Sequence, residues 1–212
     1  MAFMDGLFAR LYPAIIKGSE KKWLRVARAE LLMQAAGDVV EIGAGTGLNL
    51  EHYGPEVRSL TVTEASEYML PALREAVRKH RPDARVVHAP AESLPVPDAS
   101  ADYVISTLVL CTAGLDGTLK EVRRVLRPGG TFLVLEHVRG EGKVAAKQRR
   151  AEPFTKFFGR GCHVTRDVRA ALEGAGFDTA GVADHWVDSE PKIYAPHVQG
   201  AARLREAQAP RG

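Results

Sequence analysis

The sequence predicts an α/β fold: a doubly wound sheet of about seven strands, mostly parallel, with an antiparallel pair at its C-terminal edge and helices on both faces. Two observations predict it. Short apolar runs bounded by Gly, Pro, Asp or Ser alternate with stretches of helical periodicity, which is typical of parallel strands joined by right-handed crossovers. The first apolar run also leads into the glycine-rich loop EIGAGTG, residues 41–47, where such sheets bind their ligands.

The N-terminal residues predict two helices. Residues 3–16 place apolar side chains at helical spacing, although Gly6 and Pro13 weaken the pattern. A second helix is predicted over about residues 21–36, and Gly37 ends it. The first segment is therefore interpreted as a short amphipathic helix.

After Gly37 the apolar period changes to that of strands. The runs that predict strands are DVVEI, RSLTVTE, ARVVHA, ADYVIST and GTFLVLEHV. Helical patterns at 48–53, 66–79 and 115–126 lie between them, the last closed by RPGG. The C-terminal third predicts a helix over 165–175 and two strands, FDTAGVADHWV and PKIYAPHVQGAARL, which pair antiparallel at the sheet edge.

Composition restricts the class of protein. The 212 residues, 45% apolar and 26% charged, fit one globular domain. A net charge of +3 is too small to predict nucleic-acid binding, and the basic cluster at 143–150 is interpreted as a solvated face. No stretch reaches the ~18 consecutive apolar residues of a membrane span, and the N-terminus lacks a signal-peptide pattern. We therefore expect a soluble protein.

The two cysteines, Cys111 and Cys162, are too few for a disulfide framework, which favours a reducing, cytoplasmic setting. Cys111 follows the apolar run STLVL and is expected to be a small buried hydrophobe, whereas Cys162 is expected to be more exposed. The histidines and cysteines show no HExxH or CxxC spacing, so no metal site is predicted.

The glycine loop distinguishes between nucleotide-binding motifs. A phosphate-binding P-loop requires Lys followed by Ser or Thr after its last glycine, but Leu48 and Asn49 follow Gly47. A dinucleotide motif starting at Gly43 requires glycine at position 48, which weakens an NAD-linked oxidoreductase to a remote alternative. The remaining pattern, GxGxG preceded by Glu41, suits a ligand with an adenosine and an amino-acid tail.

A carboxylate stands at the expected distance from this loop. Glu64 ends the next predicted strand, 21 positions after Gly43. An acid about 20 residues on is where a ribose is bound, because a carboxylate accepts hydrogen bonds from both vicinal hydroxyls. Glu64 is therefore the predicted ribose ligand.

With these residues, the chain resembles the class I S-adenosylmethionine-dependent methyltransferases over roughly residues 20–200, and their Rossmann-like fold agrees with the predicted sheet. Four stretches carry the resemblance: VVEIGAGTG, TVTEASEYML, APAESLPVPDASADYVISTLVLC and EVRRVLRPGGTFLVLEHV. It implies one domain with a helical lid segment (1–36), a cofactor-binding core (37–140), an acceptor-side insertion with the final strands (141–200) and a frayed tail (201–212).

The resemblance also implies which residues bind S-adenosylmethionine. Glu41 and the glycines are expected at the methionine and ribose, Ala65 and Met69 at the adenine, and Thr107 and Leu108 beside the reactive methyl. The full expected set is Glu41, Gly43, Ala44, Gly45, Gly47, Asn49, Glu64, Ala65, Met69, Pro90, Ala91, Glu92, Thr107 and Leu108. Pro90 stands where the family often has an aspartate that binds the adenine amino group, so that hydrogen bond is not expected from this side chain.

A narrower likeness exists in STLVLCT, GCHVTRDVRAALEGAGF and PHVQGAA, which are similar to the thiol methyltransferases called methyltransferase-like protein seven. It implies a small, hydrophobic acceptor such as a thiol. Phospholipid N-methyltransferases and quinone C-methyltransferases at the membrane surface share most of these motifs and remain the alternative. The sequence leaves the oligomeric state open.

A thiol acceptor needs deprotonation, because a free thiol with a pKa of ~8.5 is mostly protonated at neutral pH. The candidate bases are His137, after the fifth strand, and His163 in GRGCHVTRD; Glu136 could position one of them. The acceptor pocket is predicted to be aromatic and closed by the N-terminal segment, which could instead contact a membrane surface weakly. Its predicted members are Phe8, Tyr12, Phe154, Phe157, Phe158 and Trp186.

Overall fold

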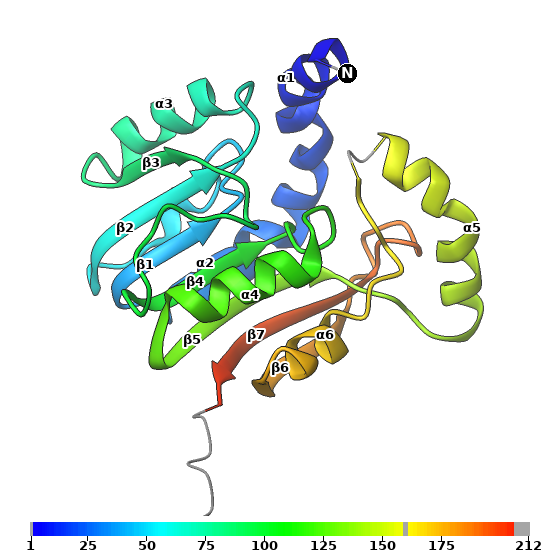
Figure 1. The fold of residues 1–212 in the computed structure, drawn as a ribbon. Coiled ribbons are helices and arrows are strands. Elements are labelled where there is room, and N and C mark those ends of the chain that lie inside the picture. The colour runs from blue at the N-terminus through cyan, green and yellow to red at the C-terminus, as the bar shows by residue number, and fades with distance from the viewer. Residues whose placement is uncertain (1, 159–160, 206–212) are drawn as a thin grey trace, which may run out of the picture.

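The computed structural model describes residues 2–158 and 161–205, with side chains for 6–157 and 161–205. Its centre is a seven-stranded sheet in the order β3-β2-β1-β4-β5-β7-β6 (Figure 1). The strands are β1 (Gly37–Ile42), β2 (Val57–Glu64), β3 (Arg85–His88), β4 (Ala101–Thr107), β5 (Leu126–His137), β6 (Phe177–Trp186) and β7 (Pro196–Leu204). β1 to β5 pair in parallel, and β7 pairs antiparallel with both β5 and β6. The predicted doubly wound sheet with an antiparallel C-terminal pair is confirmed.

Helices cover both faces of the sheet. The helices are α1 (Ala2–Ser19), α2 (Arg25–Leu32), α3 (Leu70–His80), α4 (Leu115–Val125), α5 (Gly142–Phe158) and α6 (Val168–Gly174). α2 and α3 bury Leu31 and Leu73 in one core, while α4 and α6 bury Val122 and Leu172 in the other. α1 continues into α2 through a π-helical turn, Glu20–Leu24, and stands with α5 on the side where the parallel strands end (Figure 1).

Several predicted boundaries are wrong for physical reasons. The predicted helix at 48–53 is only a 3-10 turn, Leu50–His52. The second helix ends at Leu32, and Gly37, with φ +67°, begins β1 instead of ending the helix. α5 was not predicted because its exposed side chains carry no apolar period that a sequence pattern could reveal. The predicted frayed tail begins inside β7, and residues 206–212 lie outside the described part of the chain.

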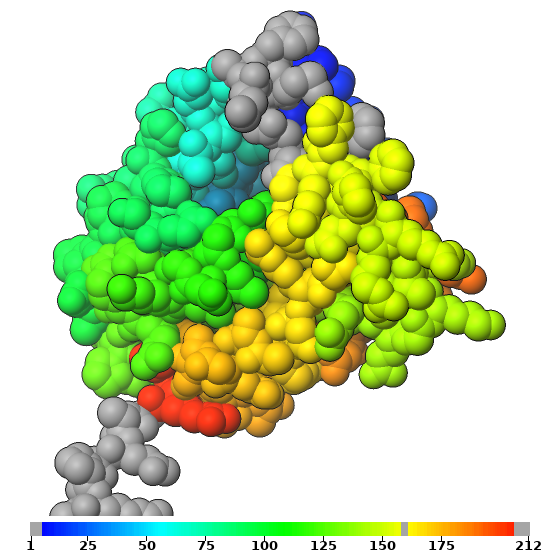
Figure 2. Space-filling model, turned by 45° about the vertical axis from the view of Figure 1, so that its right-hand side comes forward, coloured from blue at the N-terminus to red at the C-terminus, as the bar shows by residue number. Residues whose placement is uncertain are grey.

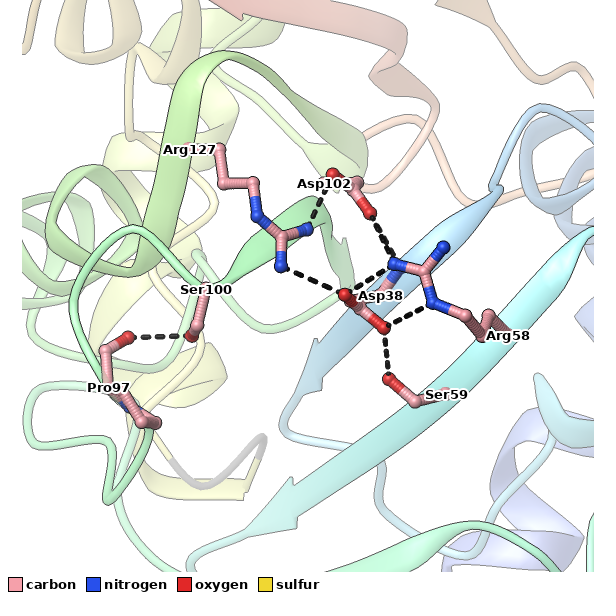
Figure 3. A network of polar contacts seen from close by, with 7 residues as sticks. All are labelled: Asp38, Arg58, Ser59, Pro97, Ser100, Asp102 and Arg127. Carbon is pink, nitrogen blue, oxygen red and sulfur yellow. Dashed lines mark hydrogen bonds and ion pairs between the residues drawn. The ribbon is translucent and has the colours of Figure 1, made fainter.

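Ion pairs fasten the amino-terminal edge of the sheet, where the parallel strands begin (Figure 3). Asp38 of β1 accepts hydrogen bonds from Arg58 and Ser59 of β2, at 2.6 and 2.7 Å, and from Arg127 of β5 at 2.9 Å. Asp102 of β4 pairs with Arg127 and accepts the backbone N–H of Asp38 at 2.8 Å. The charges therefore join four neighbouring strands at the edge opposite to the predicted ligand site.

The Asp38→Asn variant tests this network. The hydrogen bonds from Arg58, Ser59 and Arg127 hold the pKa of Asp38 below its usual value, so its carboxylate stabilises the fold above about pH 4 and this stabilisation is lost as the pH falls further. We expect Asp38→Asn to lower the free energy of unfolding by on the order of 1 kcal/mol at pH 7, since these groups are partly solvated. Urea unfolding at pH 7 and at pH 3 measures the difference, which should shrink at the lower pH. The exposed Glu30→Gln is the matched control, and an equal loss in both variants would contradict the assignment.

Candidate functional site

The glycine loop between β1 and the 3-10 turn Leu50–His52 has bare backbone where a ligand could lie. Gly43 and Gly47 have φ of +59° and +84°, and a Cβ atom on either would lie within 2.7 Å of Val109 or Ala76. Gly45 differs: a Cβ atom there would meet only the sulfur of Met69, at 3.9 Å. Two glycines are therefore required by packing inside the protein, and the middle one borders open space.

The Glu64 carboxylate ends β2 beside this loop, as predicted. Its Oε2 accepts the N–H of Gly45 at 2.8 Å, and its Oε1 accepts the N–H of Ser66 at 2.7 Å. Each oxygen retains the capacity to accept a second hydrogen bond. Glu64 can therefore hold two neighbouring hydroxyl groups while its own orientation is fixed by the backbone.

The other residues expected at the adenine lie around the ends of β2 and β3. Met69 is buried beside Gly45, and Ala65 is exposed on the loop after Glu64. Ala91 is buried, whereas Pro90 and Glu92 are exposed. The Glu92 carboxylate accepts the N–H of Gly114 at the start of α4, so it is already used to join two loops.

The tip of β4 is strained. Leu108 has φ +61°, a left-handed conformation that costs a non-glycine residue about 1–2 kcal/mol. Its N–H donates to the carbonyl of Leu135 at 2.8 Å, which fixes the turn against β5. Backbone strain of this kind is often found at functional sites. It occurs here at a residue that the family resemblance predicts to lie beside the reactive methyl.

A buried polar network supports the loop from below. Glu41 is 1% exposed and accepts hydrogen bonds from Tyr53 at 2.8 Å and Asn49 at 2.9 Å. Arg28 of α2 donates to Asn49 at 2.8 Å and to Thr107 at 2.7 Å, and Asn49 also donates to Thr107 at 3.0 Å. Burial raises the pKa of Glu41, and the bonds from Tyr53 and Asn49 oppose that shift.

The sequence analysis missed Arg28 and Tyr53. A signal for Arg28 was present, because it shares the apolar face of its helix with Leu24, Leu31 and Leu32, all of which are buried. A cation on such a face requires buried partners. The sequence could not show that these partners would be Asn49 and Thr107, which are distant along the chain.

The tip of β5 carries two titratable groups whose pKa values shift in opposite directions, the buried Glu136 and the half-buried His137. Burial raises the pKa of Glu136 to about 7, and one of its oxygens accepts from Ser106 and from the N–H groups of Val109 and Leu110. Burial lowers the pKa of His137 to about 3, with His197 contributing. His137 is therefore neutral at physiological pH, but it is a weak proton acceptor.

His163 lies in the segment that follows α5. Its Nδ1 is 3.1 Å from Oε1 of Glu152, and burial lowers its pKa. Its backbone N–H donates to the carbonyl of Cys111 at 2.8 Å, which brings this segment against the tip of β4. Cys111 is buried as predicted, at 3% exposure, and Cys162, which was predicted to be more exposed, is so only slightly, since it is buried too at 7% exposure.

The Cys111 thiol donates a hydrogen bond to the carbonyl of Leu108 at 3.6 Å, while the neighbouring Cys162 thiol raises the pKa of Cys111 and Cys111 lowers the pKa of Cys162. The two sulfurs pack with Val164 and Tyr194 in a small apolar cluster. The Tyr194 ring in turn lies 5.3 Å from the ring of His137. The predicted candidate base His137 and both cysteines are thus neighbours in the fold.

The predicted aromatic enclosure forms only in part. Phe154 and Phe157 of α5 are 68% and 67% exposed, so they do not line a closed pocket, and Trp186 is half-exposed. Phe158 lies outside the described side chains. Phe8 and Tyr12 pack together on α1, with ring centroids 5.6 Å apart. Burial raises the pKa of Tyr12, and the positive charge of Arg28 opposes that shift.

These residues fit the S-adenosylmethionine expected from the sequence. The bare backbone at Gly45 admits a ligand, and the Glu64 oxygens retain acceptor capacity for its ribose hydroxyls. Thr107 and Leu108 lie at the carboxyl end of β4, which pairs with β1. The residues after 141 form the neighbouring part of the molecular surface, yellow to orange in Figure 2. Asn49 is 1% exposed and holds the loop from beneath.

Comparisons with known proteins identify the chain as a methyltransferase. A family model described as methyltransferase domain matches residues 40–134. The chain is 32% identical to human thiol S-methyltransferase TMT1A over 77% of this chain and 69% of that protein. It is 34% identical to human thiol S-methyltransferase TMT1B over 88% of this chain and 79% of that protein. A SAM-dependent methyltransferase of Thermotoga maritima, described as a possible histamine N-methyltransferase, shares the fold with a TM-score of 0.71 at 21% identity, over 97% of this chain and all of that one.

The Tyr53→Phe variant tests the network beneath the loop. Losing the hydroxyl leaves the buried Oε2 of Glu41 without its donor, which we expect to lower the free energy of unfolding by about 1–3 kcal/mol. Urea unfolding at pH 7 measures the loss. Tyr103→Phe is the matched control, because the Tyr103 side chain packs on the same core without a hydrogen bond in the described part of the chain. Equal stability of the two variants would contradict the role of Tyr53.

Proposed function

This chain belongs to the S-adenosylmethionine-dependent methyltransferases, and we propose that it methylates the sulfur of a small, hydrophobic thiol. The observation that carries the proposal is the extent of the likeness to the thiol enzymes. The methyltransferase model ends at residue 134, but the similarity to TMT1B covers 88% of the chain and so reaches into the acceptor-side residues beyond 141. Those residues are the part of the fold that distinguishes one acceptor from another.

When bound, S-adenosylmethionine supplies a methyl group on a positively charged sulfur, and transfer to a thiolate yields a thioether and S-adenosylhomocysteine. The protein contributes mainly position. Holding two reacting atoms about 3–3.5 Å apart and aligned can account for roughly 7–11 kcal/mol of a reaction barrier. Glu64 and the loop at Gly45 fix one partner, while the rigid turn at Leu108 and the apolar cluster near Cys111 border the place of the other.

A thiol must also lose its proton. We propose His163 as the acceptor of that proton, because its imidazole is neutral at pH 7 and its Nδ1 is held by the Glu152 carboxylate. Glu152 also accepts from Thr165 at 2.7 Å, so the pair is oriented from both sides. His137 borders the same region, but its strongly lowered pKa suits a role other than proton transfer.

We also propose a cytoplasmic location, since both cysteines are free thiols, as a reducing compartment favours.

A second candidate function has one observation in its favour. On α1, Leu7, Leu11 and Ile15 are 41%, 48% and 61% exposed, and their four-residue spacing puts them on one face. We propose that this face could contact a membrane surface, where a phospholipid nitrogen or a quinone carbon would be the acceptor. Within the described residues, no helix is both long and apolar enough to cross a bilayer.

An acceptor screen with methyl-labelled S-adenosylmethionine tests the thiol proposal. We expect label in the thioether product of small apolar thiols, and little with phenols, amines or phospholipids. Glu64→Ala should weaken S-adenosylhomocysteine binding at least about tenfold, because two hydrogen bonds to a charged group are lost. Lys79→Gln on the exposed face of α3 is the control and should bind normally. Label in amines or lipids but never in thiols would overturn the acceptor while leaving cofactor binding intact.

The same assay examines the proposed base. His163→Ala should lower kcat/KM for thiols by about 10²-fold or more, and added imidazole should restore part of the rate. Glu152→Gln should have a smaller effect in the same direction, because the imidazole remains present but is less well oriented. Full activity of His163→Ala at neutral pH would show that position alone suffices.

Vesicle co-sedimentation tests the membrane candidate. We expect the full chain to pellet with vesicles of phosphatidylcholine and phosphatidylserine, and the triple variant Leu7→Gln, Leu11→Gln, Ile15→Gln to remain in solution. Val26→Gln with Met33→Gln is the matched control, since both side chains are exposed and apolar but lie away from α1, Val26 on α2 and Met33 directly after it. Negligible pelleting of the unmodified chain would retire this candidate.

A further inference from the structure

Three potential metal ligands from distant parts of the sequence meet beside the proposed acceptor site. Cys111 follows β4, His137 ends β5, and Cys162 follows α5. Two sulfurs and one imidazole nitrogen of these residues all lie within 4.8 Å of one another. The sequence predicted no metal site, because these residues lie about 25 positions apart and match none of the short ligand spacings. The fold, not the local spacing, brings them together.

The arrangement has the dimensions of a zinc site. Tetrahedral zinc binds thiolates at about 2.3 Å and imidazole at about 2.0–2.1 Å, which separates neighbouring ligand atoms by roughly 3.5–3.8 Å. Contraction from 4.8 Å therefore requires side-chain movement of only about 1 Å. Two thiolates balance the charge of the ion, and this soft donor set with one imidazole suits zinc.

The backbone around the cysteines is held in place. The Glu136 carboxylate accepts the N–H groups of Val109 and Leu110, each at 3.0 Å, which fixes the turn that carries Cys111. The carbonyl of Cys111 accepts the N–H of His163 at 2.8 Å, and the carbonyl of Cys162 accepts the Thr155 hydroxyl at 2.9 Å. Both sulfurs are thus presented by rigid main chain.

The imidazole of His137 has an unmet requirement in this structure. Its Nδ1 is buried and has no hydrogen-bond partner among the residues that the structure describes. The ring lies 4.5 Å from the His197 ring and 5.3 Å from Tyr194, but neither supplies a hydrogen bond to it. Buried polar atoms normally have a partner, so this nitrogen indicates a ligand that completes the cluster.

We propose that Cys111, His137 and Cys162 bind one zinc ion and leave its fourth coordination position open to the acceptor. Three protein ligands with an open fourth position are typical of zinc sites that act on a substrate. Each cysteine loses its S–H proton to solvent on binding, and an acceptor thiol entering the open position would be made more acidic by the ion and pass its proton to His163, without any redox change. Zinc binding stands independently of the thiol proposal, whereas the role of the open position rests on it.

Metal analysis of the full chain tests the site. The protein is expressed with zinc in the medium, purified with a phosphine reductant and no added thiol, and analysed by inductively coupled plasma mass spectrometry. We expect about one zinc per chain, and loss of at least tenfold in zinc affinity for Cys111→Ser, Cys162→Ser and His137→Ala. His163→Ala, which alters the neighbour of Cys162 without removing a ligand, should keep its zinc. Circular dichroism confirms that each variant is folded.

Cobalt substitution tests the open position. Cobalt-loaded protein should show the thiolate charge-transfer and strong visible bands of tetrahedral coordination, and 2-mercaptoethanol should shift them. Zinc-free folded protein, zinc retained in all three ligand variants, or a Cys111–Cys162 disulfide formed under the same reducing conditions would each overturn the metal site. Thiol methylation by zinc-free protein at full rate would overturn the proposed role of zinc and leave the proposed function unaffected. Bound zinc without any thiol methylation would overturn the proposed function and leave the metal site unaffected.

Discussion

The buried carboxylate of Glu41 is the group on which the cofactor edge of the sheet depends. A desolvated carboxylate is stable only with hydrogen-bond donors around it, and Tyr53 and Asn49 supply them. Asn49 is itself oriented by Arg28, whose second hydrogen bond reaches Thr107 at the end of β4. Because the buried Glu41 carboxylate needs hydrogen-bond donors, the network around it fixes the positions of α2, the glycine loop and β4 relative to one another.

The two edges of the sheet use charge in opposite ways. At the amino-terminal edge, Asp38, Asp102 and their arginines are partly solvated and joined by ion pairs (Figure 3). At the carboxyl edge, Glu136, His137 and Cys111 are withdrawn from water, and their pKa values are shifted by burial or by a neighbour. Solvated pairs stabilise without changing reactivity, whereas desolvated groups acquire unusual protonation states. The ion pairs that stabilise the fold and the groups with unusual protonation states therefore lie at opposite ends of the parallel strands.

The sequence predicted the parts that depend on local pattern. The five parallel strands follow from apolar runs, and Glu64 follows from its distance to the glycine loop. The sequence could not predict α5, because the exposed side chains of this helix lack an apolar period. It also could not predict that Phe154 and Phe157 are exposed, because the residue type alone does not show which elements pack against a side chain. Cys111, His137 and Cys162 come together only in the folded protein, because they follow β4, end β5 and follow α5. Their spacing along the chain therefore does not predict the cluster.

The strand order also affects how the chain can fold. β7 is the last strand made, yet it lies between β5 and β6 and pairs with both. During synthesis, β5 therefore keeps an unpaired edge, and β6 has no place in the sheet, until residues near 204 leave the ribosome. His197, which lies beside His137, arrives with that same segment. The acceptor side of the molecule is thus completed only after β7 has been synthesised.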